Sequence, residues 1–302
     1  MTGTNRSRYV ALALLPVAAA LFVPGAARAQ GGQDRGGPLR EAARLDREGA
    51  TTQARAILEA VLDTLTSPQA RARVHRAMAM SYAFDGDCAN VLKYEQMVID
   101  YWKTREAAEP QEAFYQQGEM ADEGARVCLD AGDFDAAEKW YRMGHELGLK
   151  EPEPRTHPRS LWDYRLAHAL GRIAARRGDA AEAKRQIAEA RRILDSDPAM
   201  AEQQERFFPY LVGYVALYTN DLEGAEAALK KAVGIPRNAR DPFMNVLLAM
   251  TYERMGRAEE AKALYRKAYD FARAHNPPTA FVRRFVREKL GAELTSTPDQ
   301  RL

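Results

Sequence analysis

The sequence predicts an all-α protein, a right-handed α-solenoid of about six stacked helix pairs that ends in a capping helix. Two observations lead to this prediction. A glycine or asparagine returns every 36 to 46 residues, where one helix would end and the next would begin. Seven residues before and five residues after each of these positions stands alanine, glycine or valine. Side chains of this size let two helices pack closely.

The first 29 residues have the composition of a secretory signal peptide. Arg6 and Arg8 precede the apolar run 9–23, and Ala27-Arg28-Ala29 forms a small-x-small cleavage site. The alternative is an uncleaved membrane anchor, but a helix needs about 20 apolar residues to cross a bilayer. We therefore expect cleavage after Ala29.

Removal of this segment changes the charge balance. Residues 1–29 hold three of the 44 basic residues and none of the 42 acidic ones, so the remainder has 41 basic and 42 acidic residues and a net charge of −1. Such a chain has no electrostatic reason to bind nucleic acid. No later apolar run is long enough to span a membrane. We expect an exported protein, periplasmic in the first instance, with secretion from the cell as the alternative.

Residues 30–37 are expected to form a flexible N-terminal segment, and the solenoid is expected to occupy residues 38–292. Each unit would be a pair of antiparallel helices joined at a residue that accepts the left-handed conformation of a helix C-terminus. These turn residues are Gly49, Gly86, Gly132, Gly178, Asn220 and Gly256. The longer middle intervals leave room for inserts, and "EPEPRTHPRS" (151–160) is a Pro-rich connector that interrupts any helix.

The unit 243–277 resembles a tetratricopeptide repeat, in which small and aromatic residues alternate at fixed positions over about 34 residues. Its matching residues are Ala249, Tyr252, Gly256, Ala261, Tyr265 and Ala268. The early Trp of the family is absent from every unit. We interpret the three C-terminal units as good repeats and the three before them as degenerate ones. The resemblance implies that the first helix of each pair lines a concave groove where protein partners bind.

A stack of such repeats exposes an apolar face at its end unless a further helix covers it. We place this capping helix at 278–292. Its apolar face would be Phe281, Val282, Phe285 and Val286, with Arg283, Arg284 and Arg287 on the outside. Residues 293–302 are expected to form a disordered tail.

Cys88 and Cys128 form an even pair in a compartment that we expect to be oxidising. Cys88 lies at the start of one predicted helix, and Cys128 lies near the end of the next. In a tetratricopeptide stack these helices pack antiparallel, which brings the two thiols together. We expect a disulfide bond between them, and the alternative is two buried free thiols.

No complete catalytic motif occurs in the chain. "GHELGL" (144–149) begins like a zinc-protease helix, but Leu149 stands where the second histidine is required. There is no nucleophile elbow, phosphate-binding loop or dinucleotide fingerprint. The five histidines, His75, His145, His157, His168 and His275, have no ligand-like spacing. We expect no enzyme activity, no metal and no cofactor, although a site assembled across several repeats remains an alternative.

Two helical stripes, each with spacings of three, four and four residues, mark a candidate binding surface. The basic stripe consists of Arg165, His168, Arg172 and Arg176, and the aromatic stripe consists of Phe207, Tyr210, Tyr214 and Tyr218. Guanidinium groups pair with carboxylates and tyrosine rings pack on apolar surface, so together the stripes would suit a peptide with acidic groups. The structural alternatives are a buried core for the aromatic stripe and a solvated face for the basic one.

Three functions therefore compete. The first is a non-catalytic exported scaffold that binds a peptide segment or protein partner in the cell envelope through this groove. The second is a periplasmic accessory that holds a small anionic or aromatic molecule for an uptake or assembly system. The third is an enzyme. The fold alone does not choose among them, and the sequence carries no signal for the oligomeric state.

Overall fold

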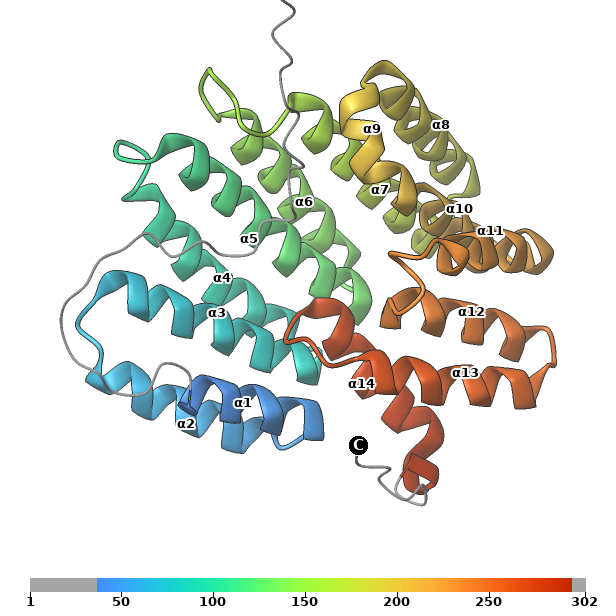
Figure 1. The fold of residues 1–302 in the computed structure, drawn as a ribbon, viewed down its shortest axis with the longest axis horizontal. Coiled ribbons are helices and arrows are strands. Elements are labelled where there is room, and N and C mark those ends of the chain that lie inside the picture. The colour runs from blue at the N-terminus through green and yellow to red at the C-terminus, as the bar shows by residue number, and fades with distance from the viewer. Residues whose placement is uncertain (1–36, 295–302) are drawn as a thin grey trace, which may run out of the picture. The chain divides into compact units, whose positions relative to one another are not determined.

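A computed structural model describes residues 37–294, and all regular elements in this range are helices (Figure 1). The all-α prediction is confirmed. The first half contains α1 (Gly37–Glu48), α2 (Thr51–Thr64), α3 (Pro68–Asp85), α4 (Cys88–Lys103), α5 (Pro110–Ala131), α6 (Phe134–Leu149) and α7 (Arg159–Arg177). The second half contains α8 (Ala180–Ser196), α9 (Pro198–Gln204), the 3₁₀ turn η1 (Glu205–Phe207), α10 (Phe208–Tyr218), α11 (Leu222–Gly234), α12 (Pro242–Arg254), α13 (Ala258–Phe271), α14 (Pro277–Leu290) and the 3₁₀ turn η2 (Gly291–Leu294).

The ends of the solenoid differ slightly from the expected boundaries. The expected signal peptide 1–29, the segment 30–36 and the last residues 295–302 lie outside the described part of the chain. Helix α1 already begins at Gly37, and η2 extends to Leu294. Regular structure therefore includes one residue of the expected N-terminal segment and the first two of the expected tail.

Six helix pairs follow one another, namely α1–α2, α3–α4, α5–α6, α7–α8, α10–α11 and α12–α13. The residue at each of the six predicted turns is left-handed, with φ from 68° at Asn220 to 92° at Gly132. Such a residue ends the first helix because the next amide can turn back onto its last carbonyls. In four of the pairs an aspartate follows directly and caps the second helix, as Asp133 does by accepting from the Ala136 amide at 3.0 Å. A cap of this kind stabilises a helix by about 1 kcal/mol.

The small residues near the turns are where the two helices of a pair touch. The residue that lies five positions after each turn is at most 2% exposed in every pair. These residues are Ala54, Val91, Ala137, Ala183, Ala225 and Ala261. At Gly213 a side chain has no room at all, because a Cβ there would lie 2.6 Å from Leu229 Cγ. The recurring small residues therefore set the distance between the helices.

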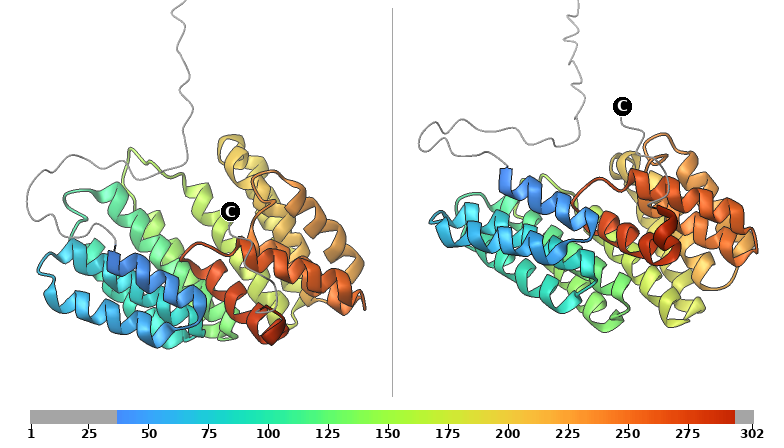
Figure 2. Two further views of the ribbon diagram at one scale, coloured as in Figure 1. Left: turned by 60° about the horizontal axis from the view of Figure 1, so that its bottom comes forward. Right: turned by 90° about the horizontal axis from the view of Figure 1, so that it is seen from below.

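Helix α14 does not simply cap the last repeat. It packs on α12 and α13, and it also contacts α3, α5 and α1, so it lies between the first and last repeats in all views (Figures 1 and 2). The expectation that Arg283, Arg284 and Arg287 face outward is wrong. Arg287 Nη1 donates to the Arg47 carbonyl at 3.5 Å, and the Arg284 guanidinium occupies the space beside the Gly86 turn.

These arginines have a physical reason to lie there. The C-terminal ends of α1 and α3 present free carbonyl groups and the negative end of the helix dipole. Gly49 and Gly86 have no side chain, which leaves room for a guanidinium group against each turn. Cations on α14 thus complement two helix ends from repeats far away in the sequence.

A buried aspartate connects the same segments. Asp46 of α1 is 0% exposed, and its carboxylate lies 2.7 Å from Ser81 Oγ of α3 and 2.8 Å from His275 Nε2. His275 belongs to the loop before α14 and stacks on Phe84 with a ring separation of 5.5 Å. The loop that positions α14 is therefore fixed to the first two repeats.

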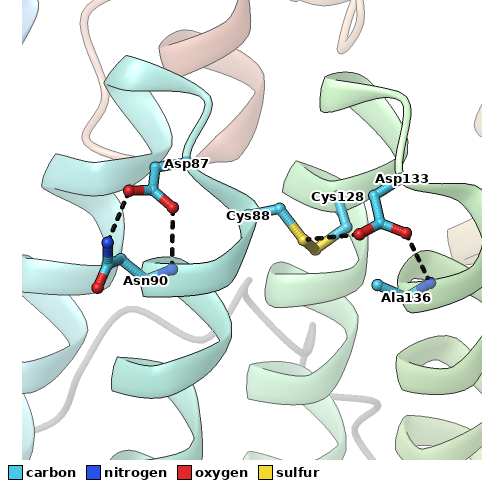
Figure 3. The surroundings of a disulfide bond; sticks show 6 residues. All are labelled: Asp87, Cys88, Asn90, Cys128, Asp133 and Ala136. Carbon is cyan, nitrogen blue, oxygen red and sulfur yellow. Dashed lines mark hydrogen bonds between the residues drawn. A yellow bond between two sulfur atoms is a disulfide. The ribbon is translucent and has the colours of Figure 1, made fainter.

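A disulfide joins Cys88 at the start of α4 to Cys128 near the end of α5, across a sequence separation of 40 residues (Figure 3). Cys128 is completely buried. Each cysteine lies close to a capping aspartate, Asp87 or Asp133, and Asp133 Oδ2 is 4.0 Å from Cys88 Sγ. The bond links the second and third repeats at their turns.

Replacing Cys88 and Cys128 together by alanine should lower the free energy of unfolding by about 4 kcal/mol, because the unfolded chain is then no longer closed into a loop. Urea unfolding measures the difference. Dithiothreitol should lower the free energy of unfolding of the unchanged protein by a similar amount. It should not change that of the double variant. A double variant as stable as the parent would contradict the prediction.

Replacing Asp46 by alanine should lower the free energy of unfolding by about 2–3 kcal/mol, because two donors lose a buried acceptor. Hydrogen exchange should show faster exchange of the α14 amides, since the loop before α14 is released. The matched control is Asp163→Ala, which removes the partner of His145 at 2.8 Å. The Asp163 side chain is 47% exposed, so this change should cost less than about 1 kcal/mol. Unchanged protection of α14 in the Asp46 variant would refute this role.

Candidate functional site

The first helices of the middle repeats surround a cavity of about 490 Å³. Helices α5 and α7 supply half of the lining residues, α6 and α10 contribute one tyrosine each, and the α9–η1 segment, the loop before α14 and the start of α14 complete the wall. The lining residues are Glu119, Asp122, Glu123, Arg126, Tyr141, Tyr164, Arg165, His168, Arg172, Gln204, Arg206, Phe207, Tyr210, Asn276, Pro277 and Pro278.

The structure brings residues of both predicted stripes to this cavity, but not all of them. Five of their eight residues line the cavity: Arg165, His168, Arg172, Phe207 and Tyr210. Arg176, Tyr214 and Tyr218 lie beside it and not in its wall. Phe207 is not on the same helix as the other aromatic residues, because α10 begins at Phe208 and Phe207 lies in η1.

The basic stripe of α7 is bonded to neighbouring helices and is not a solvated face. Arg165 forms an ion pair with Glu119 of α5, and its guanidinium lies 4.9 Å from the Trp162 ring centre. Arg172 is only 5% exposed. Its Nη1 donates to Tyr210 Oη at 3.2 Å and its Nη2 to Tyr141 Oη at 3.1 Å.

The aromatic stripe of α10 is largely core. Tyr214 is 1% exposed and Tyr210 is 6% exposed. Tyr214 accepts a hydrogen bond of 3.4 Å from Arg176 Nη1, and the same guanidinium lies 4.8 Å from the Tyr218 ring centre. The two stripes thus bond to each other, arginine to tyrosine, across the α7–α10 contact. Only part of each stripe is left to contact a partner.

Several lining residues were not singled out from the sequence. Glu119, Asp122 and Arg126 follow one another at spacings of three and four on α5, which is the same signal that marked the other stripes. Arg206 lies in the short η1 turn between α9 and α10. No helical periodicity extends over that turn, so the sequence offered no pattern that would find it.

Asp122 has the most unusual titration in the cavity. Burial raises the pKa of its carboxyl to about 8, against the opposing attraction of the Arg165 guanidinium, while Glu119 adds to the rise. Its Oδ1 lies where a side chain at Gly144 of α6 would stand, 2.5 Å from the position of a Cβ. Asp122 is therefore mostly protonated at pH 7.

The described residues contain no group of three or more His, Cys, Asp and Glu side chains that is arranged to hold a metal ion. In the same part of the chain, no helix has both the length and the apolar character that crossing a bilayer requires.

Comparison with known proteins supports the interpretation of the repeats. Residues 244–275 match the model of the tetratricopeptide repeat family. This segment of the chain is therefore similar to a tetratricopeptide repeat. The matched segment contains almost all of α12 and all of α13, the unit whose small and aromatic residues follow the family pattern most fully.

Among solved structures, the chain is similar to the crystal structure of the yeast Tom70. The two share 14% sequence identity over 89% of this chain and 68% of that chain, with a TM-score of 0.29. A likeness this loose transfers neither a ligand nor a partner. No curated protein matches the sequence.

The stability of the protein should depend on the ionisation of Asp122. The folded state holds the Asp122 proton up to about pH 8, whereas the unfolded chain releases it near pH 4. Between these values ionisation opposes folding, so the contribution of Asp122 should fall as pH rises, by at most about 1.4 kcal/mol per pH unit.

Asp122→Asn keeps the shape of the side chain and cannot ionise. Its free energy of unfolding should equal that of the parent near pH 4 and exceed it at pH 8, as measured by urea unfolding across this range. Parallel stability curves for the two proteins would show that Asp122 is already ionised in the folded state.

Proposed function

We propose that this protein is a non-catalytic scaffold that binds a protein partner, or a peptide segment of one, on the inner side of its middle repeats. One observation carries the proposal. Three successive first helices, α5, α7 and α10, present charged and aromatic side chains to a cavity that a partner can enter. Tetratricopeptide repeats are interaction modules, and their stacked helices form extended binding surfaces.

The chemistry of the wall suits a partner with acidic groups. Arg172 offers a guanidinium whose side-chain partners are neutral tyrosine hydroxyls, and Arg206 in the same lining donates to Asn238 Oδ1 at 3.2 Å. A carboxylate on the partner would be a stronger acceptor than either neutral oxygen. Phe207, half-buried beside Arg206, offers apolar surface to the same partner.

We also propose that the protein works outside the cytoplasm, in the cell envelope. The basic and apolar character of residues 1–29 supports export. The Cys88–Cys128 disulfide supports it independently, because such bonds persist in oxidising compartments and are rare in the cytosol.

A second function is favoured by the size and the lining of the cavity. Pro277 and Pro278 at the start of α14 contribute to its lining, and α14 itself packs against α3 and α5. A volume of about 490 Å³ lies within the ordinary range of small-molecule sites. The protein would then be a ligand-binding accessory of an uptake or assembly system.

A photo-crosslinking amino acid at position 204 tests the scaffold directly in cells. Gln204 lines the cavity, so irradiation should join the protein to a protein partner in the envelope fraction. The matched control carries the same group at position 192, where the Arg192 side chain is 66% exposed on α8. It should give no such product. Equal crosslinking from both positions, or none from position 204, would overturn binding on the inner side. Recovery of the protein in the cytoplasmic fraction alone would overturn export.

A further inference from the structure

Four polar atoms of the cavity-lining side chains have no hydrogen-bond partner within residues 37–294. They are Arg126 Nη2, Tyr164 Oη, His168 Nε2 and Arg206 Nε. Tyr164 is only 2% exposed and His168 only 8%. An unsatisfied buried polar atom costs roughly 1–3 kcal/mol, and native proteins contain few of them. Four around one cavity indicate a ligand that completes their hydrogen bonds.

These atoms are mostly donors. The nitrogens of Arg126 and Arg206 can only donate, and the Tyr164 hydroxyl can do so as well. Burial and the nearby Arg172 charge lower the pKa of His168, so its imidazole is neutral, and Nε2 donates or accepts according to the tautomer. A molecule that satisfies this set must supply acceptor atoms.

Two guanidinium groups of the cavity also lack a counter-ion. Neither Arg172 nor Arg206 takes part in any ion pair within the described range, and their hydrogen bonds go to tyrosine hydroxyls, a backbone carbonyl and the Asn238 amide oxygen. A buried cation without an anion is strongly unfavourable. Arg172, at 5% exposure, is the clearest case.

The acidic residues of the cavity do not neutralise these cations. Glu119 is paired with Arg165, and Glu123 is paired with Arg76. Asp122 is mostly uncharged at pH 7, because burial raises its pKa to about 8. The cavity therefore keeps an excess of positive charge.

The remaining wall is aromatic and apolar. The rings of Tyr141, Tyr164, Phe207 and Tyr210 line it, together with Pro277. Helix α14 packs on α3 and α5, so the inner side toward the first repeats is covered by the chain itself. These features favour a compact molecule over an extended peptide that would follow the whole inner surface.

We propose that this cavity binds a small free acid, with its carboxylate among Arg126, Arg172, Arg206 and the Tyr164 hydroxyl and an aromatic or other apolar body against the tyrosine rings. The inference rests on the second proposed function, the ligand-binding accessory, and does not depend on the protein scaffold.

Isothermal titration calorimetry of the purified protein with phenylacetate tests the proposal. Phenylacetamide has the same shape without the charge and should bind at least about tenfold more weakly, because hydrogen bonds to charged groups are the stronger ones. Inorganic phosphate, which lacks the apolar body, should also bind more weakly than phenylacetate. An acetylated tripeptide that ends in a free Phe carboxylate tests whether the carboxylate comes from a chain end.

Tyr164→Phe separates a ligand-binding role from a structural one. It removes only a hydroxyl that has no partner, so the melting temperature of the ligand-free protein should stay the same or rise. Phenylacetate affinity should nevertheless fall about tenfold, and Arg206→Gln should have a similar effect. The matched control is Tyr265→Phe, which removes a hydroxyl that donates to Glu253 at 2.9 Å outside the cavity. It should lower the melting temperature and leave the affinity unchanged.

Three results would overturn the proposal. The first is no binding of phenylacetate, and the second is equal binding of phenylacetate in the Tyr164 and Arg206 variants. The third is tighter binding of the peptide than of phenylacetate, which would assign the donors to the end of a protein chain. Crosslinking from position 204 is measured separately, so loss of the small-acid site leaves the scaffold proposal standing, and loss of the crosslink leaves the site standing.

Discussion

The position of α14 depends on one buried carboxylate, and the wall of the cavity depends in turn on the position of α14. Asp46 accepts from Ser81 and from His275, residues of α3 and of the loop that leads into α14. A carboxylate at 0% exposure is stable only if its oxygens are satisfied. The same contact therefore satisfies Asp46 and holds together segments that are 229 residues apart. Pro277 and Pro278 follow directly and form part of the cavity lining.

The repeats themselves are held by local rules that do not depend on this closure. A left-handed residue ends each first helix, and in four pairs an aspartate begins the second helix at once. These caps satisfy amides and carbonyls that each helix end would otherwise leave free. The small residues on both sides of the turn then allow the two helices to touch. Each pair is thus specified by residues close to its own turn, and neighbouring pairs add their contacts one interface at a time.

Electrostatics distinguishes the middle of the inner surface from the rest of the protein. Most charged groups elsewhere are paired on exposed helix faces, where each pair contributes little to stability. Around the cavity, in contrast, arginines are buried against tyrosine rings and hydroxyls. Tyrosine is well suited to this place because it offers both an acceptor and a π face to the same cation. Such a wall is held by hydrogen bonds of its own and still has donors left for a ligand.

The sequence by itself determined the helices and their turns, because these depend on patterns that repeat every 3.6 residues or on caps formed by adjacent residues. It also determined that Arg165, His168, Arg172 and Arg176 share one helix face. Only the tertiary structure decided what that face meets. Arg172 bonds to tyrosines 31 and 38 residues away, and Arg284 and Arg287 of α14 turn inward to helix ends of the first repeats. Such contacts depend on how each repeat rotates against the next and on whether the inner surface is covered by the chain itself. No local pattern encodes this, since the same spacing of arginines fits a solvated face and a buried one equally well.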